Sequence, residues 1–96
     1  MLFEWDDNKQ ASNLEKHGID FEDIVGVWKR AIIDPFSTRH VDNELRHLAL
    51  GILVGEKPTG GIIVAVLYTM RNGNHRIISA RKARSSEQAA YRAAFG

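Results

Sequence analysis

The 96-residue sequence contains no cysteine and only two prolines. The absence of cysteine excludes disulfides and thiolate metal sites, and it is typical of a reducing cytoplasm, where we expect the protein to act. No signal segment opens the chain, and the longest apolar run, GGIIVAVLY at 60–68, is too short to cross a bilayer. The four histidines show no metal-ligand spacing. We therefore expect no membrane association, no metal and no cofactor.

Acidic residues are scarce in the second half of the chain. Residues 1–48 carry six Lys/Arg and ten Asp/Glu, whereas residues 49–96 carry seven Lys/Arg and two Asp/Glu. The formal net charge of +1 therefore conceals an acidic half and a basic half. A basic surface attracts phosphates or an acidic protein. A solvated basic helix and turn is the alternative.

The remaining pattern predicts a single α+β domain over residues 1–96, because strands gather in the second half and helices are set apart from them. A short strand is expected at 2–5, followed by a helix that Asp6 or Asp7 caps and Gly18 ends. Asp20 caps a second helix. Further strands are expected at 31–34, 46–54, 62–69 and 74–82, with a polar loop or irregular edge at 36–44 and a short last helix opened by a Ser85–Gln88 capping box. The prediction is two N-terminal helices and a short C-terminal helix on a mainly antiparallel sheet of four to five strands.

Asn72-Gly73 predicts a two-residue type I′ hairpin, which fixes a register. Arg71 should face Asn74 and Thr69 should face Arg76, so Arg71 and Arg76 emerge on one face of the sheet. Arg81 should lie a strand length away, near Val64. One compact phosphate could not then touch both groups of basic residues.

Residues typical of one known family occur along nearly the whole chain. They are Phe3, Trp5, Asp6, Lys9, Asn13, Lys16, His17, Gly18, Phe21, Glu22, Asp34, Pro35, the order His40, Glu44, Arg46 before a strand with Gly51, the segment RIISARKA at 76–83, Glu87 and Tyr91. In these positions the sequence resembles the BrnT family, toxins of type II toxin–antitoxin modules related in fold to RelE-like ribonucleases. Met70 departs from the acid that the family commonly has before Arg71, and the connection at 55–61 is longer than usual.

The resemblance implies a small cytoplasmic toxin that cleaves RNA and arrests translation. It also implies a BrnA-like antitoxin as partner, a toxin–antitoxin heterotetramer, and contact with DNA only through the antitoxin, which would repress its own operon.

Metal-independent RNA cleavage needs a group that deprotonates the 2′-OH, cations for the phosphorane and a proton for the leaving 5′ oxygen. Arginines match phosphate oxygens but scarcely act as bases. We therefore expect several arginines and one titratable partner, and the candidate catalytic residues are Arg81, Arg46, Arg76, His40 and Glu44.

Three of the five candidates have a structural alternative. Arg81, near the last helix, is the first choice for phosphate contact. Arg46 could instead cap an ion pair with Glu44, and Arg76 could pair with acids of the two helices. His40 titrates near neutrality, with Glu44 orienting it or serving as the base, but a lone loop histidine is more often structural.

Further RNA contacts are expected from Arg71, Lys82, Arg84 and Tyr91. Lys82 and Arg84 could contact the antitoxin instead, and Tyr91 could pack on the sheet rather than stack on a base. Two other function classes stay open. One is a non-catalytic module whose basic face binds an acidic partner chain. The weaker one is a direct DNA-binding regulator, because no helix carries several basic side chains on one face.

Overall fold

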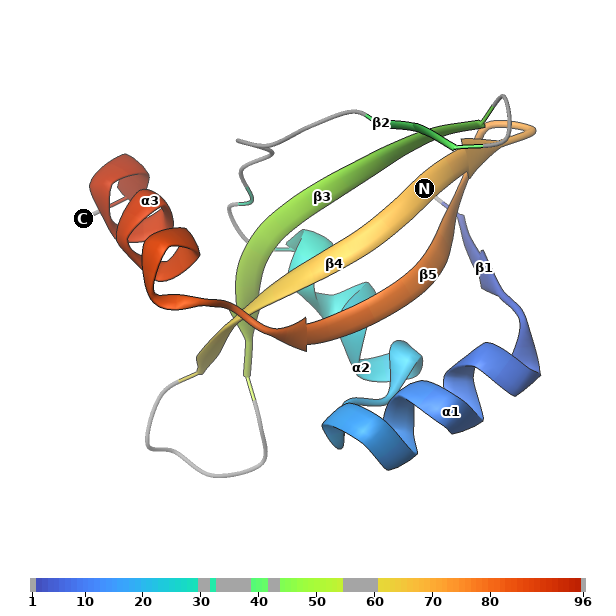
Figure 1. Ribbon diagram of the computed structural model, residues 1–96, viewed down its shortest axis with the longest axis horizontal. Helices are drawn as coiled ribbons and strands as arrows, with labels where there is room; N and C mark the ends of the chain where they lie inside the picture. The colour runs from blue at the N-terminus through green and yellow to red at the C-terminus, as the bar shows by residue number, and fades with distance from the viewer. Residues whose placement is uncertain (1, 30–31, 33–38, 42–43, 55–60, 96) are drawn as a thin grey trace.

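The computed structural model describes residues 2–29, 32, 39–41, 44–54 and 61–95. In chain order the elements are β1 (Phe3–Trp5), α1 (Asp7–His17), α2 (Phe21–Ile24), the 3-10 helix η1 (Val25–Lys29), β2 (Arg39–Val41), β3 (Glu44–Leu53), β4 (Ile62–Arg71), β5 (Asn74–Lys82) and α3 (Ser85–Phe95). The five strands form one sheet in the order β1-β5-β4-β3-β2, in which only β1 runs parallel to its neighbour (Figure 1). This arrangement confirms the α+β class, with a mixed sheet.

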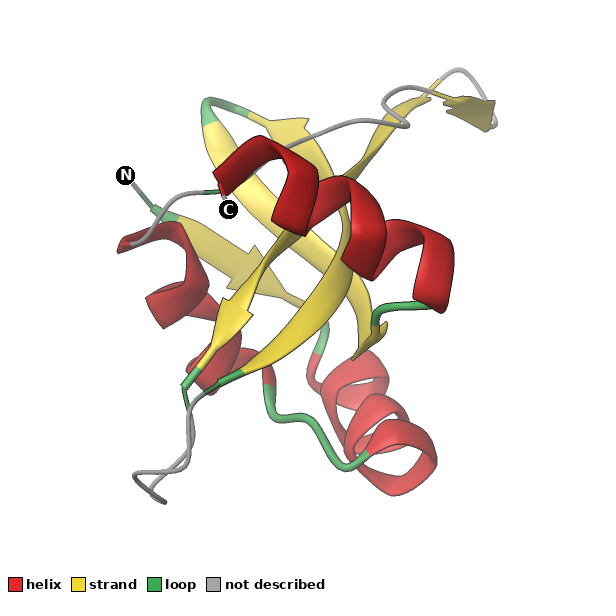
Figure 2. Cartoon of the chain, turned by 90° about the vertical axis from the view of Figure 1, so that its left-hand side faces the viewer, coloured by secondary structure: helices red, strands yellow, loops and turns green. Residues whose placement is uncertain are grey.

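The sheet separates two apolar cores, so the domain has three layers (Figures 1 and 2). On one face, α1, α2 and η1 bury Phe21, Ile24 and Val27 against the sheet. On the other face, α3 packs Tyr91 against β3 and β4. We call these the α1–α2 face and the α3 face. Because α3 lies near one end of the strands, it leaves the other end of the α3 face uncovered. Polar side chains occupy that uncovered end.

Both N-terminal helices begin where their capping residues predict, and α1 also ends at the predicted glycine. The Asp6 side chain accepts hydrogen bonds from the amides of Asn8 and Lys9, and Gly18 ends α1 with a left-handed φ of 68°. Asp20 caps α2 through the Glu22 amide at 2.9 Å. These caps satisfy amides that the first turn of a helix leaves without partners.

The second helix is shorter than its apolar spacing predicts, because α2 continues as the 3-10 helix η1. This tighter turn buries Val27 at 1% exposure. Val27 packs directly over Gly51 of β3, where a Cβ atom would overlap its side chain. A glycine is therefore needed at this position for close packing between η1 and the sheet.

The second predicted strand, at 31–34, lies outside the described residues except for Ile32. The structure instead forms the short edge strand β2 within the segment predicted as loop or irregular edge. Its pairing with β3 completes the sheet at five strands.

Candidate functional site

The β4–β5 hairpin adopts the predicted turn. Asn72 and Gly73 both have positive φ, at 54° and 79°, as a type I′ turn requires. Arg71 faces Asn74 and Thr69 faces Arg76, as the turn predicts. Cross-strand partners share a face, so Arg71 and Arg76 project from the same side of the sheet.

A row of polar side chains crosses four strands at this end of the sheet. Arg46 of β3 pairs in register with Thr69 of β4, Thr69 with Arg76 of β5, and Arg76 with Glu4 of β1. Arg46 alternates with Leu48 and Leu50, which belong to the core under α3. The row therefore lies on the α3 face, beyond the part that α3 covers.

Acidic side chains form ion pairs with the three arginines of this region. We call these three residues, Arg46, Arg71 and Arg76, the arginine face. Glu44 lies 3.1 Å from Arg71 and 3.9 Å from Arg46, so one carboxylate lies between two guanidinium groups. Glu4 contacts Arg76 at 3.4 Å. The alternative of an Arg46–Glu44 ion pair is thus present in the structure, whereas the acid of Arg76 comes from β1 and not from the helices.

The arginine heads stay accessible to a ligand despite these ion pairs. The side chains of Arg46, Arg71 and Arg76 are 27%, 50% and 24% exposed. Arg46 also has a buried Nε with no hydrogen-bond partner among the described residues. Thr69 lies between Arg46 and Arg76, and its hydroxyl donates to the Leu45 carbonyl at 2.6 Å.

A β-bulge places Arg81 on the same face as these arginines. Tyr68 pairs with Ile77, but Leu67 pairs with Ser79, which leaves Ile78 as an extra residue in β5. An extra residue reverses the alternation of side chains beyond it. Arg81 therefore faces Ala65 in the core under α3, one position from Val64, near which the sequence predicted it. Without the bulge Arg81 would lie on the opposite face from Arg76.

The side chain of Asn13 in α1 forms a hydrogen bond with the main chain just beyond the bulge. Its Oδ1 accepts a hydrogen bond from the Ala80 amide at 3.0 Å, and its Nδ2 donates to the Ile19 carbonyl at 3.1 Å. Asn13 is only 5% exposed. Since a buried amide without a partner is costly, this side chain stabilises the irregular pairing that orients Arg81.

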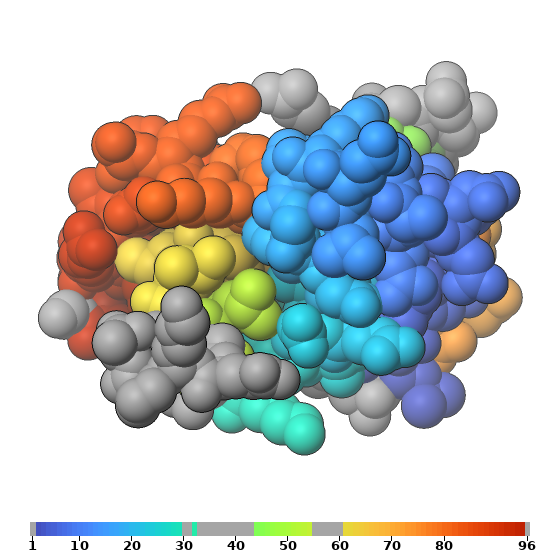
Figure 3. Space-filling model, turned by 90° about the horizontal axis from the view of Figure 1, so that it is seen from below, coloured from blue at the N-terminus to red at the C-terminus, as the bar shows by residue number. Residues whose placement is uncertain are grey.

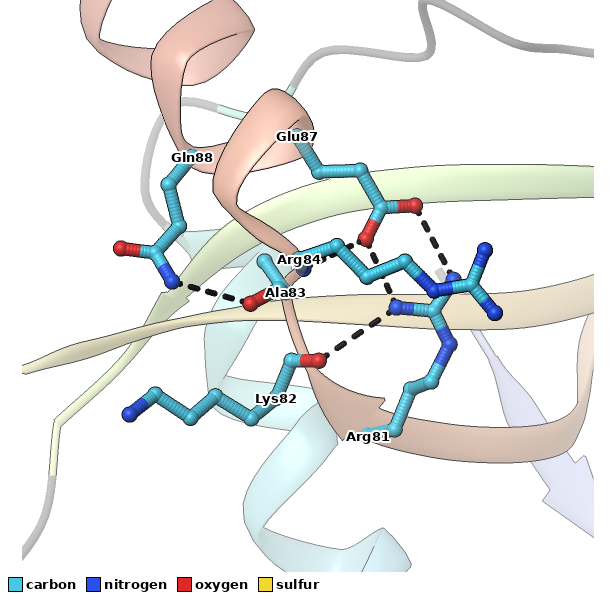
Figure 4. A network of polar contacts seen from close by, with 6 residues as sticks. All are labelled: Arg81, Lys82, Ala83, Arg84, Glu87 and Gln88. Atoms are coloured by element: carbon cyan, nitrogen blue, oxygen red, sulfur yellow. Dashed lines mark hydrogen bonds and ion pairs between the residues drawn. The ribbon is translucent and has the colours of Figure 1, made fainter.

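Arg81 is engaged by Glu87 from the first turn of α3 (Figure 4). Its two terminal nitrogens lie 2.7 and 3.0 Å from the two carboxylate oxygens, and Glu87 is 6% exposed. Glu87 also accepts from the Arg84 amide at 2.8 Å, so this acid closes the helix cap in place of the predicted Ser85–Gln88 box. The hydrogen bond from Arg81 holds the pKa of Glu87 below its usual value, and the same bond raises the pKa of Arg81.

The other candidate residues differ in how accessible they are. Lys82 and Arg84 are exposed beside α3. Tyr91 is 5% exposed within the core under α3, which favours packing over base stacking. The backbone of His40 pairs with Leu45, and its side chain lies outside the described part of the chain.

The histidines that the sequence left without a role pack on the α1–α2 face. The rings of His47 and His75 stack on Tyr68, with ring centroids 5.1 and 5.3 Å apart, and Trp28 packs edge-on to Tyr68 and His75. Burial is the main cause that lowers the pKa of His75, so this ring is neutral at physiological pH. It adds no positive charge for a phosphate.

Two contributors were missed in the sequence, Glu4 and Glu87. Glu4 reaches Arg76 only because β1 pairs in parallel with β5, and nothing local predicts that pairing. Glu87 lies three residues after Arg84, the spacing at which a side chain returns to the N-cap amide, and this signal could have identified it. Within the described ranges, no cluster of three His, Asp or Glu side chains suits a metal ion, and no helix is long and apolar enough to span a membrane.

Two comparisons with known proteins give matches. A family model described as the ribonuclease toxin BrnT of the type II toxin–antitoxin system matches residues 5–87. The 1.1 Å crystal structure of the Brucella abortus ribonuclease toxin BrnT is similar at a TM-score of 0.60 and 25% identity, over 88% of this chain and 100% of that one. A search of curated proteins found no significant match.

Proposed function

The chain belongs to the BrnT family of ribonuclease toxins of type II toxin–antitoxin systems, and from that premise we propose that its arginine face binds RNA and cleaves it without a metal ion. The single observation that carries this proposal is the convergence of Arg46, Arg71 and Arg76 on one accessible part of the sheet. Like charges gathered in this way suit a polyanion, because each phosphate can replace a surface acid as the counter-ion.

The proposed reaction uses the RNA's own 2′-OH as the nucleophile. Its oxygen attacks the neighbouring phosphorus, a base removes its proton, the bond from phosphorus to the 5′ oxygen breaks, and that oxygen takes up a proton. Arg46 and Arg76 stabilise the negative charge that develops on the phosphorane, and Arg71 positions the strand. The products are a 2′,3′-cyclic phosphate and a 5′-hydroxyl.

Glu44 and His40 are the proposed proton-transfer groups. Glu44 contacts two arginines of the site directly. His40 lies on the neighbouring strand β2, with its backbone paired one position from Arg46. The variants Glu44→Gln and His40→Gln show which of the two residues is the base. Only loss of the true base changes the pH profile of cleavage.

For Arg81 we propose a supporting role in place of the phosphate contact expected from the sequence. Both terminal nitrogens of its guanidinium are already hydrogen-bonded to Glu87. A phosphate would have to displace a carboxylate that is 6% exposed, which costs more than displacing a surface acid. Arg81 and Glu87 then fix α3 to the end of β5.

The binding partner and the cellular location are proposed from the family. We propose a BrnA-like antitoxin that forms a heterotetramer with this chain and carries the DNA contact, a RelE-like ancestry for the fold, and action in the cytoplasm. Lys82 and Arg84, exposed and away from the arginine face, are proposed to contact the antitoxin or the flanking RNA.

One observation favours a non-catalytic binding module as the second candidate. Each arginine of the arginine face already has an acid partner, and such pairs also occur as purely structural features. In that function the basic half would bind an acidic partner chain and no RNA would be cleaved.

The purified chain, incubated with RNA in excess chelator, tests the two candidates. We expect cleavage with 2′,3′-cyclic phosphate ends, and growth arrest when the chain is expressed alone. Harmless expression of the folded wild-type chain, with intact RNA in the assay, would reject the ribonuclease and favour the binding module.

A further inference from the structure

A groove of about 500 Å³ lies between α3 and the far ends of β3 and β4. Its apolar lining includes Ile52, Ile62, Ile63 and Phe95. Seen from below, the red side chains of α3, the orange end of β5 and the yellow start of β4 form one side of the molecule, and the blue and cyan α1 and α2 form the other (Figure 3). A groove of this size accommodates several large side chains of a partner.

Two of the large apolar side chains that line this groove are exposed. Ile62 is 45% exposed and Phe95 is 47% exposed. Single exposed apolar residues are ordinary, but a group of them beside a groove marks an interaction surface. These side chains lie outside the buried cluster under α3, to which Leu50 and Tyr91 belong.

The charged side chains that line the groove are Lys82 and Arg92, both cations. Among the described residues, neither forms an ion pair with an acid. In this respect the groove differs from the arginine face, where Glu44 and Glu4 supply the negative charge. A partner that buries the apolar lining should therefore bring its own carboxylates.

We propose that this groove docks an apolar segment of the antitoxin that carries acidic side chains at its margins. The inference rests on the toxin's place in a type II module, as given under the proposed function, and not on the assignment of the catalytic arginines. Apolar anchors of the segment fill the space between Phe95 and Ile62, and its carboxylates pair with Lys82 and Arg92.

The groove is separate from the arginine face. Ile52 lies six residues beyond Arg46 along β3, a distance of about 20 Å at the usual rise per residue of a strand. A segment in the groove therefore leaves the arginines uncovered. It anchors the antitoxin, and a different part of that chain must reach the arginine face to block RNA.

Two groove variants, each with a matched control elsewhere, test the proposal. Phe95→Asp places a charge among the apolar anchors, and Leu14→Asp makes the same change at an equally exposed position of α1. Arg92→Glu reverses a groove charge, and Lys29→Glu reverses a charge on η1. The probe is the purified antitoxin of the module, and the readouts are its Kd for each variant and the RNA affinity and cleavage rate of each free variant.

We expect Phe95→Asp to weaken antitoxin binding by about 30-fold or more and Arg92→Glu by about 10-fold. Both controls should bind normally, and all four free variants should cleave RNA within about twofold of the wild-type rate. In cells, Phe95→Asp should be toxic even in the presence of the antitoxin.

Unchanged antitoxin affinity in both groove variants would overturn the proposal. So would a loss of RNA affinity with antitoxin affinity retained, because that result assigns the groove to RNA. A wild-type chain that fails to cleave RNA contradicts the proposed function alone, since the antitoxin titration does not depend on cleavage.

Discussion

The two ends of the sheet hold basic residues in different ways. At the hairpin end, Arg46, Arg71 and Arg76 converge on one region and contact the acids Glu44 and Glu4. At the other end, Lys82 and Arg92 stand beside apolar side chains with no ion pair among the described residues. The first arrangement is preorganised for exchange of a carboxylate for a phosphate. The second suits a protein that supplies both apolar anchors and acids.

The largest expected effect is a loss of RNA cleavage when one arginine of the arginine face is removed. Arg76→Gln should lower the rate of RNA cleavage about 10²–10³-fold, because it removes a fixed cation from the phosphorane. Stability should change by less than about 1 kcal/mol, since the Arg76–Glu4 pair is partly exposed. Cleavage kinetics and thermal unfolding measure the two quantities.

Lys29→Gln serves as the control for Arg76→Gln, because it removes one charge from the opposite side of the sheet. A fall in activity as large in this variant as in Arg76→Gln would mean that net charge, and not position, governs cleavage.

The next effect concerns the bulge that aligns Arg81 with the arginine face. Asn13→Leu leaves the Ala80 amide and the Ile19 carbonyl buried without partners, and it should lower the free energy of unfolding by about 2–4 kcal/mol. Denaturant unfolding measures the loss, and the Ala80 amide should exchange faster with solvent.

Asn13→Asp distinguishes the two hydrogen bonds, because it retains the acceptor for Ala80 and removes the donor to Ile19. Slow exchange at Ala80 should persist in Asn13→Asp. Fast exchange in both variants would show that the side chain's acceptor does not stabilise the bulge.

Loss of the Arg81–Glu87 pair should cost slightly less. Arg81→Ala leaves a nearly buried carboxylate without its cation, and we expect a loss of about 2–3 kcal/mol, below the full value for a buried pair because Arg81 is 26% exposed. Arg81 holds the pKa of Glu87 below its ordinary value. The pair's contribution is therefore complete above the ordinary glutamate pKa and is lost as the pH falls through the lowered folded-state pKa.

Unfolding curves of wild type and Arg81→Ala, recorded from neutral to acidic pH, should accordingly converge in acid. A stability difference that stays constant across this range would exclude ionisation of Glu87 as its source. Activity lost only in proportion to the unfolded fraction would support the supporting role of Arg81.

The smallest expected effect is a change in RNA affinity after removal of the acid that pairs with Arg76. Glu4→Gln removes the carboxylate that competes with phosphate for Arg76, so RNA affinity should rise about two- to fivefold, as expected for a partly exposed ion pair. Binding of a 2′-O-methyl RNA, which cannot be cleaved by 2′-OH attack, gives the measurement. Weaker binding would show that Glu4 orients Arg76 productively.

The sequence predicted those parts of the molecule that local chemistry determines. Asn72-Gly73 gave the hairpin and its register, and Asp6, Gly18 and Asp20 gave the limits of the first helices, because turns and caps depend on neighbouring residues.

Non-local pairing determines what the sequence did not predict. The bulge at Ile78 lies beside the hydrogen bond between Asn13 and Ala80, 67 residues apart, and it brings Arg81 to the face of Arg76. Likewise Glu4 becomes the partner of Arg76 only through the parallel pairing of the first strand with the last. A one-residue change of register is invisible to alternation patterns, yet it reverses which side chains share a face.

The most direct test of the division between the two ends is an NMR titration of the labelled protein with a short 2′-O-methyl RNA. We expect the Nε–H signals of Arg46, Arg71 and Arg76 to shift with the backbone amides around them, while the signals of Lys82 and Arg92 stay in place. Shifts concentrated at Lys82, Arg92 and α3, with the arginine face unchanged, would contradict this expectation.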